Sequence, residues 1–278
     1  MLKVINKYLY NRVKQHEDLC NICLSSKINR KRIDYLGEVK PPAYVKNRSM
    51  VFKICEDCGY SFCKENFKDY LTLGSKSISS IENCKRVGSR QNKGREFFMA
   101  NGAIAILKKK KLRILVFAPG NSLDHQTIRE LDSVDTCKVT DLSNFQESEH
   151  FIPLDTKEQF DIVIACEVVE HFMEPRKEFF NLFRYLDKDG LLMISTDTRV
   201  EDAVTERLYP FLYGHTSYYS GKSLIFLAGM NDIFIDFRTP EGETFNSKIK
   251  RYIYMTKSKN THLKIIDRFS IITHPMAE

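Results

Sequence analysis

The chain has 278 residues, a formal net charge of +7 and 42% apolar residues. This length suits one α/β domain of about 150 to 200 residues plus a smaller module, and the apolar content supplies an ordinary core. No apolar run approaches the roughly 18 residues of a membrane span, and the basic N-terminus lacks the apolar centre of a signal peptide. We therefore expect a cytoplasmic protein that is not inserted into a membrane. The four lysines at 108–111 precede a buried strand pattern and indicate a solvated helix end, with an anionic-substrate or nucleic-acid surface as the alternative.

Two Cys-x-x-Cys pairs follow a helix that is expected over residues 1–17. The first pair is Cys20 and Cys23, and the second is Cys55 and Cys58. Each pair brings two thiolates to one point, and four thiolates bind Zn²⁺ tetrahedrally. Such a site has no open position, so the zinc would be structural and would stabilise a segment too small for its own core. Free core thiols and a redox pair are the alternatives, although neither pair lies in a thioredoxin-like βαβ context.

From residue 94 onward the pattern alternates helices and buried strands, which is typical of an α/β fold with a parallel sheet. Strands are expected at 112–117, 136–140, 151–154, 160–166, 191–195, 233–237 and 251–256. Helices are expected at 94–108, 122–133, 175–186 and 222–230. We divide the chain into an N-terminal helix and zinc-binding module (1–66), a helical connector (67–110), a main domain (111–257) and a C-terminal extension (258–278).

The most informative block runs from residue 160 to residue 197. A buried strand leads into an acidic turn that contains Glu170-His171, and Pro175 opens an amphipathic helix. Asp-Lys-Asp-Gly at 187–190 ends that helix before the next buried strand. This block resembles strands four and five of class I S-adenosylmethionine (SAM) methyltransferases, whose usual sequence pattern is FDxV…EH…P…LKPGG. The resemblance implies a Rossmann-like, seven-stranded α/β domain with SAM as cofactor, to which the small zinc-binding module is attached.

The resemblance also assigns cofactor-binding residues. Ala118 and Gly120 lie in the loop after the first strand, where the family has a glycine-rich sequence that lets the backbone approach the ligand. Here the loop is degenerate, and Val116 replaces the usual acid. Asp141 ends the second strand, where a carboxylate binds the ribose hydroxyls; a helix-capping aspartate is the alternative. Cys166, at the end of the fourth strand, should lie beside the cofactor.

The acceptor side is predicted around Glu167, Glu170, His171 and the later His215. Glu-x-x-Glu-His followed by a second histidine resembles ubiquinone-biosynthesis O-methyltransferases and small-RNA 2′-O-methyltransferases. In those groups the matching side chains bind a divalent metal such as Mg²⁺, which lowers the pKa of the acceptor hydroxyl and positions it. A metal-free general base or acceptor contact, and a purely structural Glu-His turn, are the two alternatives.

These patterns predict a SAM-dependent methyltransferase that acts on a hydroxyl or amine of a small polar metabolite. Tyr213 and Tyr218 should line the acceptor pocket. A sugar or nucleotide-linked sugar of cell-surface glycan synthesis is the expected acceptor, by family analogy alone. The alternatives are an RNA 2′-O-methyltransferase, and a catalytically silent zinc-binding interaction module on a methyltransferase fold. The residues leave the methylated atom and the oligomeric state open.

Overall fold

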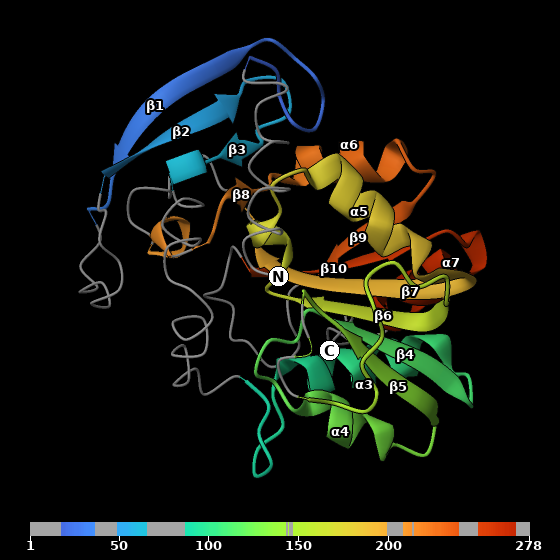
Figure 1. The fold of residues 1–278 in the computed structure, drawn as a ribbon. Coiled ribbons are helices and arrows are strands. Elements are labelled where there is room, and N and C mark those ends of the chain that lie inside the picture. The colour runs from blue at the N-terminus through green and yellow to red at the C-terminus, as the bar shows by residue number, and fades with distance from the viewer. Residues whose placement is uncertain are drawn as a thin grey trace, which may run out of the picture.

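The computed structural model describes residues 18–36, 49–65, 87–142, 144, 147–198, 208–212, 214–238 and 250–270. Two sheets lie side by side in this part of the chain (Figure 1). The small sheet has the order β1-β2-β3-β8, and the large one has the order β5-β4-β6-β7-β10-β9. The helix expected over 1–17 lies outside the described residues. None of the helices in the described parts is both long and apolar enough to cross a lipid bilayer.

The small sheet is built from β1 (Ile28–Asp34), β2 (Ser49–Cys55), β3 (Ser61–Phe62) and β8 (Ser217–Tyr218). The large sheet is built from β4 (Leu112–Phe117), β5 (Val134–Thr140), β6 (Phe160–Cys166), β7 (Leu186–Asp197), β9 (Phe234–Arg238) and β10 (Lys250–Thr256). The helices are α3 (Arg95–Leu107), α4 (Asp124–Arg129), α5 (Pro175–Arg184), α6 (Gly221–Gly229) and α7 (Lys259–Ser270). Two 3₁₀ turns are η1 (Val169–His171) and η2 (Tyr209–Phe211).

The large sheet has the topology expected of the predicted fold class. Strands β5, β4, β6 and β7 pair in parallel, whereas β10 runs antiparallel between β7 and β9. The strand order reverses between β4 and β6, and ligands of such sheets bind at the carboxyl ends beside that reversal. The expected strand at 151–154 is reduced to an isolated parallel bridge between Val139 and Phe151. The Rossmann-like α/β class is thus confirmed, with six strands and this bridge in the described residues.

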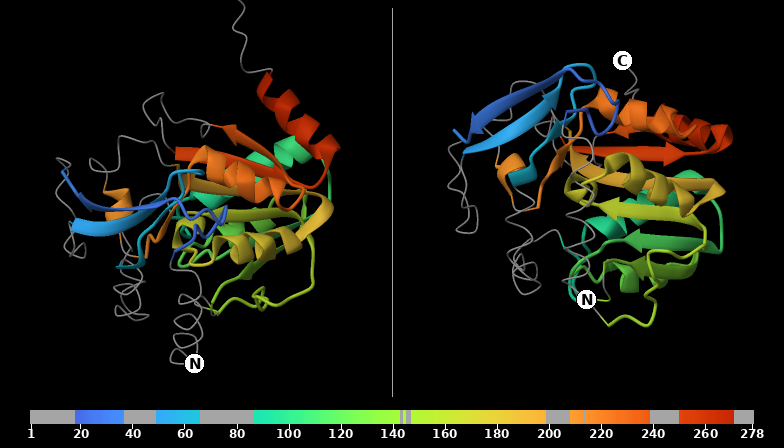
Figure 2. Two further views of the ribbon diagram at one scale, coloured as in Figure 1. Left: turned by 90° about the horizontal axis from the view of Figure 1, so that it is seen from above. Right: turned by 45° about the horizontal axis from the view of Figure 1, so that its top comes forward.

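Alternation along the central strands divides the core between the two faces of the large sheet. Ile162 and Ile164 of β6 pack in the cluster that contains α3 and α7, whereas Val163 and Ala165 pack in the cluster that contains α5 and α6. Figure 2 shows the sheet between these helices. The predicted C-terminal extension begins with α7, which buries Ile265 in the first of these clusters.

Strand β8 connects the two sheets. It follows β7 in the chain, yet it pairs antiparallel with β3, placing Ser61 opposite Tyr218 and Phe62 opposite Ser217. The backbone NH of Cys63 donates to the Thr216 carbonyl at 2.9 Å, which continues this ladder by one step. The small sheet is therefore hydrogen-bonded to the segment that precedes α6.

The end of α5 differs from the prediction. The helix ends at Arg184, and β7 begins at Leu186, because residues 187–190 form a bulge within the strand and not a turn before it. A Cβ at Gly190 would lie 2.8 Å from the carbonyl oxygen of Phe160, so the bulge needs a residue without a side chain. A glycine in a turn-like sequence thus belongs to a strand here.

Candidate active site and cysteine cluster

The loop after β4 has the backbone conformation of a glycine-rich loop. Ala118 has φ +52° and Gly120 has φ +56°, both in the left-handed region that residues with a Cβ rarely adopt. A Cβ added at Gly120 would meet nothing within 4 Å, so this side of the loop is open. The degenerate loop is therefore left-handed at two positions and open beside Gly120, which is compatible with the predicted cofactor role.

Asp141 lies against this loop from the end of β5. Its Oδ2 accepts from the backbone NH of Gly120 at 3.2 Å, and its Oδ1 accepts from Leu142 at 2.6 Å. Burial raises the pKa of this carboxyl, and the two backbone hydrogen bonds oppose that shift. Each carboxylate oxygen can accept a further bond, so the contacts are compatible with the predicted ribose role.

A buried acid pair beneath the loop was missed by sequence reasoning. Asp124 accepts from the backbone NH groups of Gly94 at 2.7 Å and Phe97 at 3.1 Å, and so caps α3 from a different helix. Ser122 donates to the carboxyl of Glu96. Burial raises the pKa of Glu96 to about 8. A glutamate in a helix normally faces solvent, so only the fold reveals this pair.

Glu96→Gln should flatten the pH dependence of stability. With a folded-state pKa near 8, against about 4.5 in the unfolded chain, Glu96 favours folding below pH 4.5 and loses this contribution as pH rises through 8. The neutral amide does not titrate, so the drop in melting temperature from pH 6 to pH 8.5 should be about 5 °C smaller in the variant. Thermal scans at both pH values measure this.

Glu130→Gln is the control for this prediction, because Glu130 is an exposed acid at the end of α4. It should keep the wild-type pH dependence. If the melting temperature of wild type and of Glu96→Gln fell equally from pH 6 to pH 8.5, Glu96 would be ionised in the folded protein.

Glu167 directly follows the carboxyl end of β6. It has φ +54°, its Oε1 accepts from Ser195 at 2.7 Å, and its Oε2 pairs with Arg95 at 3.2 Å. Ser195 also lies 3.3 Å from the sulfur of Cys166, so the ends of β6 and β7 meet here. Glu167 was grouped with the predicted metal ligands, but the structure does not bring it into their cluster.

The other three predicted residues do come together. Glu170, His171 and His215 each offer one ligand atom, and these atoms all lie within 4.8 Å of one another; we call them the acid–histidine cluster. The carboxylate of Glu170 is fully buried and accepts from Tyr209 at 2.7 Å and from Thr196 at 3.3 Å. These two hydroxyls hold one orientation of the carboxylate.

His171 of this cluster is a neutral base. Nδ1 of His171 lies 3.0 Å from the Gly214 carbonyl oxygen, which can only accept, so Nδ1 carries the proton and Nε2 carries the lone pair. Burial lowers the pKa of His171, which keeps the ring neutral at physiological pH. The His171 and His215 rings meet edge to face at 4.9 Å. A neutral imidazole with a fixed tautomer can act as a proton acceptor or as a metal ligand.

The tyrosines around the cluster differ in role. Tyr209, which was not singled out from the sequence, stacks edge-on against His215 at 4.3 Å. Tyr218 is buried, and its hydroxyl donates to the His215 carbonyl at 2.6 Å, so it supports the backbone of the cluster. Tyr213 lies outside the described residues. Tyr209 therefore contacts the side chains of the acid–histidine cluster, whereas Tyr218 contacts its backbone.

The four predicted cysteines converge at one end of the small sheet. The Sγ atoms of Cys20 and Cys58 are 3.6 Å apart, those of Cys23 and Cys55 are 3.5 Å apart, and all four lie within 4.8 Å of one another. Disulfide sulfurs would be about 2.05 Å apart. Four thiolates about 2.3 Å from a tetrahedral Zn²⁺ would be separated by roughly 3.8 Å. The cluster is compatible with a zinc site, and we call it the cysteine cluster.

A parallel sheet continued by an antiparallel β10, with an open left-handed loop after its first strand, defines the class I methyltransferase fold. The sequence pattern of a family described as "Methyltransferase domain" matches residues 84–228. The chain belongs to this methyltransferase family and is a SAM-dependent enzyme. A search of curated proteins gives no match.

Several solved structures are similar to the chain. A plantazolicin methyltransferase, BpumL, bound to a triazolic desmethylPZN analogue and S-adenosylhomocysteine, has 14% identity over 68% of this chain and 91% of its own, with a TM-score of 0.48. A 1,6-didemethyltoxoflavin-N1-methyltransferase from Burkholderia thailandensis has 13% identity over 69% and 87%, with a TM-score of 0.47. The CMeT domain of the citrinin polyketide synthase has 18% identity and a TM-score of 0.41. The match covers 53% of this chain but only 46% of the CMeT chain.

Proposed function

We propose that this methyltransferase transfers a methyl group to a hydroxyl or amine of a small polar metabolite, namely a sugar or nucleotide-linked sugar. The observation that carries the proposal is the acid–histidine cluster, which follows β6 on the same edge of the sheet as the cofactor loop. A neutral base beside the cofactor edge suits an acceptor that must lose a proton.

In this proposal SAM supplies the electrophilic methyl group, and the protein positions the acceptor. Nε2 of His171 accepts the proton of the acceptor hydroxyl, while the Gly214 carbonyl holds the ring in the required tautomer. Glu170, oriented by Tyr209 and Thr196, supplies a fixed negative charge that stabilises the imidazolium.

Two metals are part of the proposal. Zn²⁺ at the cysteine cluster would be structural, because four thiolates leave no open coordination position. As the alternative to the general base, Glu170, His171 and His215 would together hold a divalent cation such as Mg²⁺. Such a cation would lower the pKa of the acceptor hydroxyl. Thiolate ligation of zinc also suits a reducing cytoplasm.

The proposal is tested by methyl transfer from labelled SAM to a panel of nucleotide-linked sugars, together with calorimetric binding of S-adenosylhomocysteine. Asp141→Ala should weaken binding of this nucleoside about tenfold or more, because hydrogen bonds to a carboxylate contribute about 1.5 to 3 kcal/mol each. Asp132→Ala, an exposed acid at the opposite end of β5, is the matched control and should bind normally.

Three outcomes would contradict parts of this proposal. No binding of S-adenosylhomocysteine by the wild type would favour a silent interaction module. Unchanged affinity in Asp141→Ala would remove this residue from the ribose role. Methylation of RNA, with binding that weakens steeply as salt rises, would replace the small acceptor by a nucleic acid.

A further inference from the structure

An ion pair joins the start of α3 to the end of β6. Nη1 of Arg95 lies 3.2 Å from Oε2 of Glu167, and the two side chains are 21% and 23% exposed. The pair is thus largely withdrawn from water and still partly open to a ligand. Charges in such a place are screened less by salt than charges on an exposed surface.

Two contacts fix the start of α3 to the segment that follows β4. Glu96 accepts from Ser122 of the loop after β4. Asp124, at the start of α4, accepts from the backbone NH of Gly94 at 2.7 Å. Arg95 lies between Gly94 and Glu96 in the chain, so its backbone is held next to this loop.

The end of β6 lies level with the same loop. β4 and β6 are parallel neighbours, and Val116 lies opposite Ile164, one residue before the end of β4 and two before that of β6. Adjacent strands are about 4.8 Å apart, so Glu167, which follows β6 directly, lies beside the first residues of the loop. Burial raises the pKa of the Cys166 thiol, and the carboxylates of Glu96 and Glu167 raise this pKa further, so both acids lie near that sulfur.

The positions of the two paired residues do not favour stability alone. Arg95 is the first residue of α3, where a cation opposes the helix macrodipole. Glu167 has φ +54°, in the left-handed region that residues with a Cβ rarely adopt. Backbone strain of this kind is concentrated at ligand sites. An unfavourable charge and an unfavourable backbone angle in one ion pair therefore indicate a binding role.

The cofactor has charges that the loop after β4 does not match. The amino-acid end of SAM carries an ammonium and a carboxylate, which need partners of opposite sign. β4 ends in two apolar residues, and the loop at 118–122 has no charged side chain. Asp141 contributes a carboxylate alone, and this carboxylate already accepts two backbone hydrogen bonds. Arg95 and Glu167 supply one charge of each sign beside this loop.

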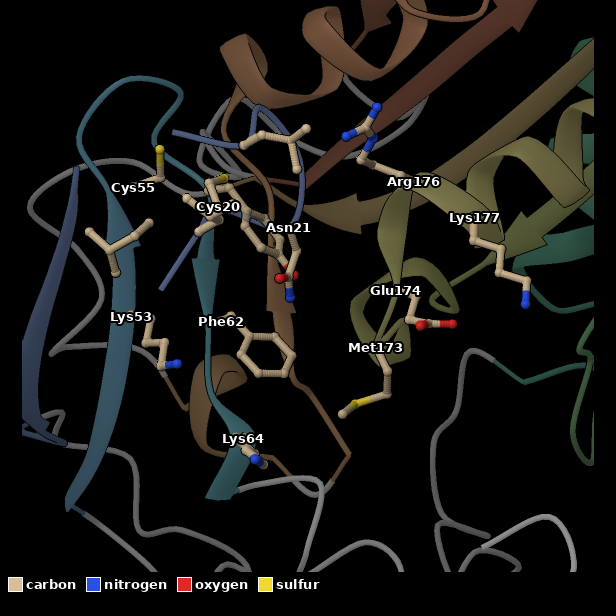
Figure 3. A pocket seen from close by; sticks show the side chains of 14 residues that line it. Cys20, Asn21, Lys53, Cys55, Phe62, Lys64, Met173, Glu174, Arg176 and Lys177 are labelled. Carbon is tan, nitrogen blue, oxygen red and sulfur yellow. The ribbon is translucent and has the colours of Figure 1, made fainter. Parts of the chain in front are cut away.

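A pocket of about 250 Å³ lies elsewhere, between the small sheet and the start of α5 (Figure 3). Glu174 and Arg176 also bring opposite charges to this pocket. None of its described lining residues belongs to the loop after β4 or to the ends of β5 and β6. Arg95 and Glu167 are therefore better placed than this pocket to meet a cofactor held by that loop.

We propose that Arg95 and Glu167 bind the amino-acid end of SAM. The guanidinium of Arg95 binds the carboxylate, whose planar shape it matches, and Glu167 accepts from the ammonium. Ser195 donates to the other oxygen of Glu167 and holds its orientation. Each member of the ion pair exchanges its partner for a group of the same charge, so binding leaves no charge unmatched. The inference rests on the SAM dependence of the family and not on the proposed acceptor, and it makes Glu167 a cofactor residue.

The experiment measures binding of three ligands to the full-length protein by calorimetry. They are S-adenosylhomocysteine, its decarboxylated analogue and its deaminated analogue. All three share the nucleoside, so the contacts of the base and the ribose stay constant. The wild type should bind S-adenosylhomocysteine about tenfold or more tightly than either analogue, because each analogue lacks one charge-assisted contact.

Two variants assign the two contacts. Arg95→Gln should weaken binding of S-adenosylhomocysteine about tenfold or more, but binding of the decarboxylated analogue should stay the same or tighten, because Glu167 is released for its ammonium. Glu167→Gln should give the mirror result with the deaminated analogue. Arg113→Gln is the matched control, because it breaks the 2.9 Å ion pair with Asp187 at the amino end of β4. It should bind all three ligands like the wild type.

The three affinities separate this inference from the other proposals. Equal affinity of the wild type for all three ligands would overturn it and leave the SAM dependence intact. A variant that lost affinity for all three ligands equally would overturn it in favour of a structural ion pair. Absence of binding of every ligand would overturn it together with the cofactor. The expected affinities without methyl transfer to any sugar would support it and overturn the proposed acceptor alone.

Discussion

Cys58→Ser is expected to release zinc and to lower the melting temperature by about 10 °C or more. The loss of a structural metal removes several kcal/mol, and each kcal/mol corresponds to about 2 to 4 °C in a chain of this size. The effect should extend beyond the small sheet, because Cys20, Cys55 and Cys58 pack in the same core cluster as Phe179 and Leu182 of α5. Zinc content by mass spectrometry and a thermal scan measure both parts.

Cys63→Ser is the matched control for the cysteine cluster. Cys63 is a fully buried thiol of the same module, but it lies outside the four converging sulfurs and contacts Met50. The variant should keep its zinc even if its stability falls. A wild-type protein without zinc, or Cys58→Ser protein that retains zinc, would contradict a four-thiolate site.

His171→Ala is expected to lower kcat by a factor of about 10² to 10⁴, with less than about a twofold change in the affinity for S-adenosylhomocysteine. The imidazole is proposed to act on the acceptor, so cofactor binding should be nearly unaffected. Because burial lowers the pKa of His171, wild-type activity should stay on its plateau at neutral pH and fall only below the usual histidine value of about 6.5. Steady-state kinetics across pH measure both quantities.

His262→Ala serves as the control, because His262 stacks on Phe234 at the opposite edge of the sheet. It should leave kcat unchanged. A loss of activity on chelation, restored by Mg²⁺, would assign His171 to metal binding, whereas insensitivity to chelation would favour the general base. Equal losses of kcat and of cofactor affinity in His171→Ala would instead give the residue a structural role.

The sequence predicts local elements well where the pattern is strong. The apolar runs of β4 and β6 and the proline at the start of α5 place those elements correctly, because a buried parallel strand and a helix N-terminus have distinctive compositions. The two Cys-x-x-Cys pairs also predict the convergence of their four sulfurs, because this spacing is typical of metal ligands. Glu170 and His171 were singled out from their place after the fourth strand, and the structure brings them together with His215.

Other features depend on contacts between distant residues. The pairing of β3 with β8 places Ser61 opposite Tyr218, and the nearby hydroxyl contact between Tyr60 and Ser217 joins residues 157 positions apart. No local pattern indicates that Tyr209 reaches Glu170, or that Ser122 reaches Glu96. The bulge at 187–190 has the composition of a turn, and only the paired backbone of Phe160 shows that it lies within a strand.

The ladder between β3 and β8 affects how the chain can be shortened. A cut at residue 66 would remove β3 and leave the backbone of β8 as an unpaired edge, which is a template for aggregation. The cut would also remove Tyr60, whose ring centroid lies 5.6 Å from that of Tyr219. The apolar surface that Tyr60 covers would then be exposed to water. His215 lies two residues before β8, so the truncated protein would lose the support of one residue of the acid–histidine cluster along with the cysteine cluster.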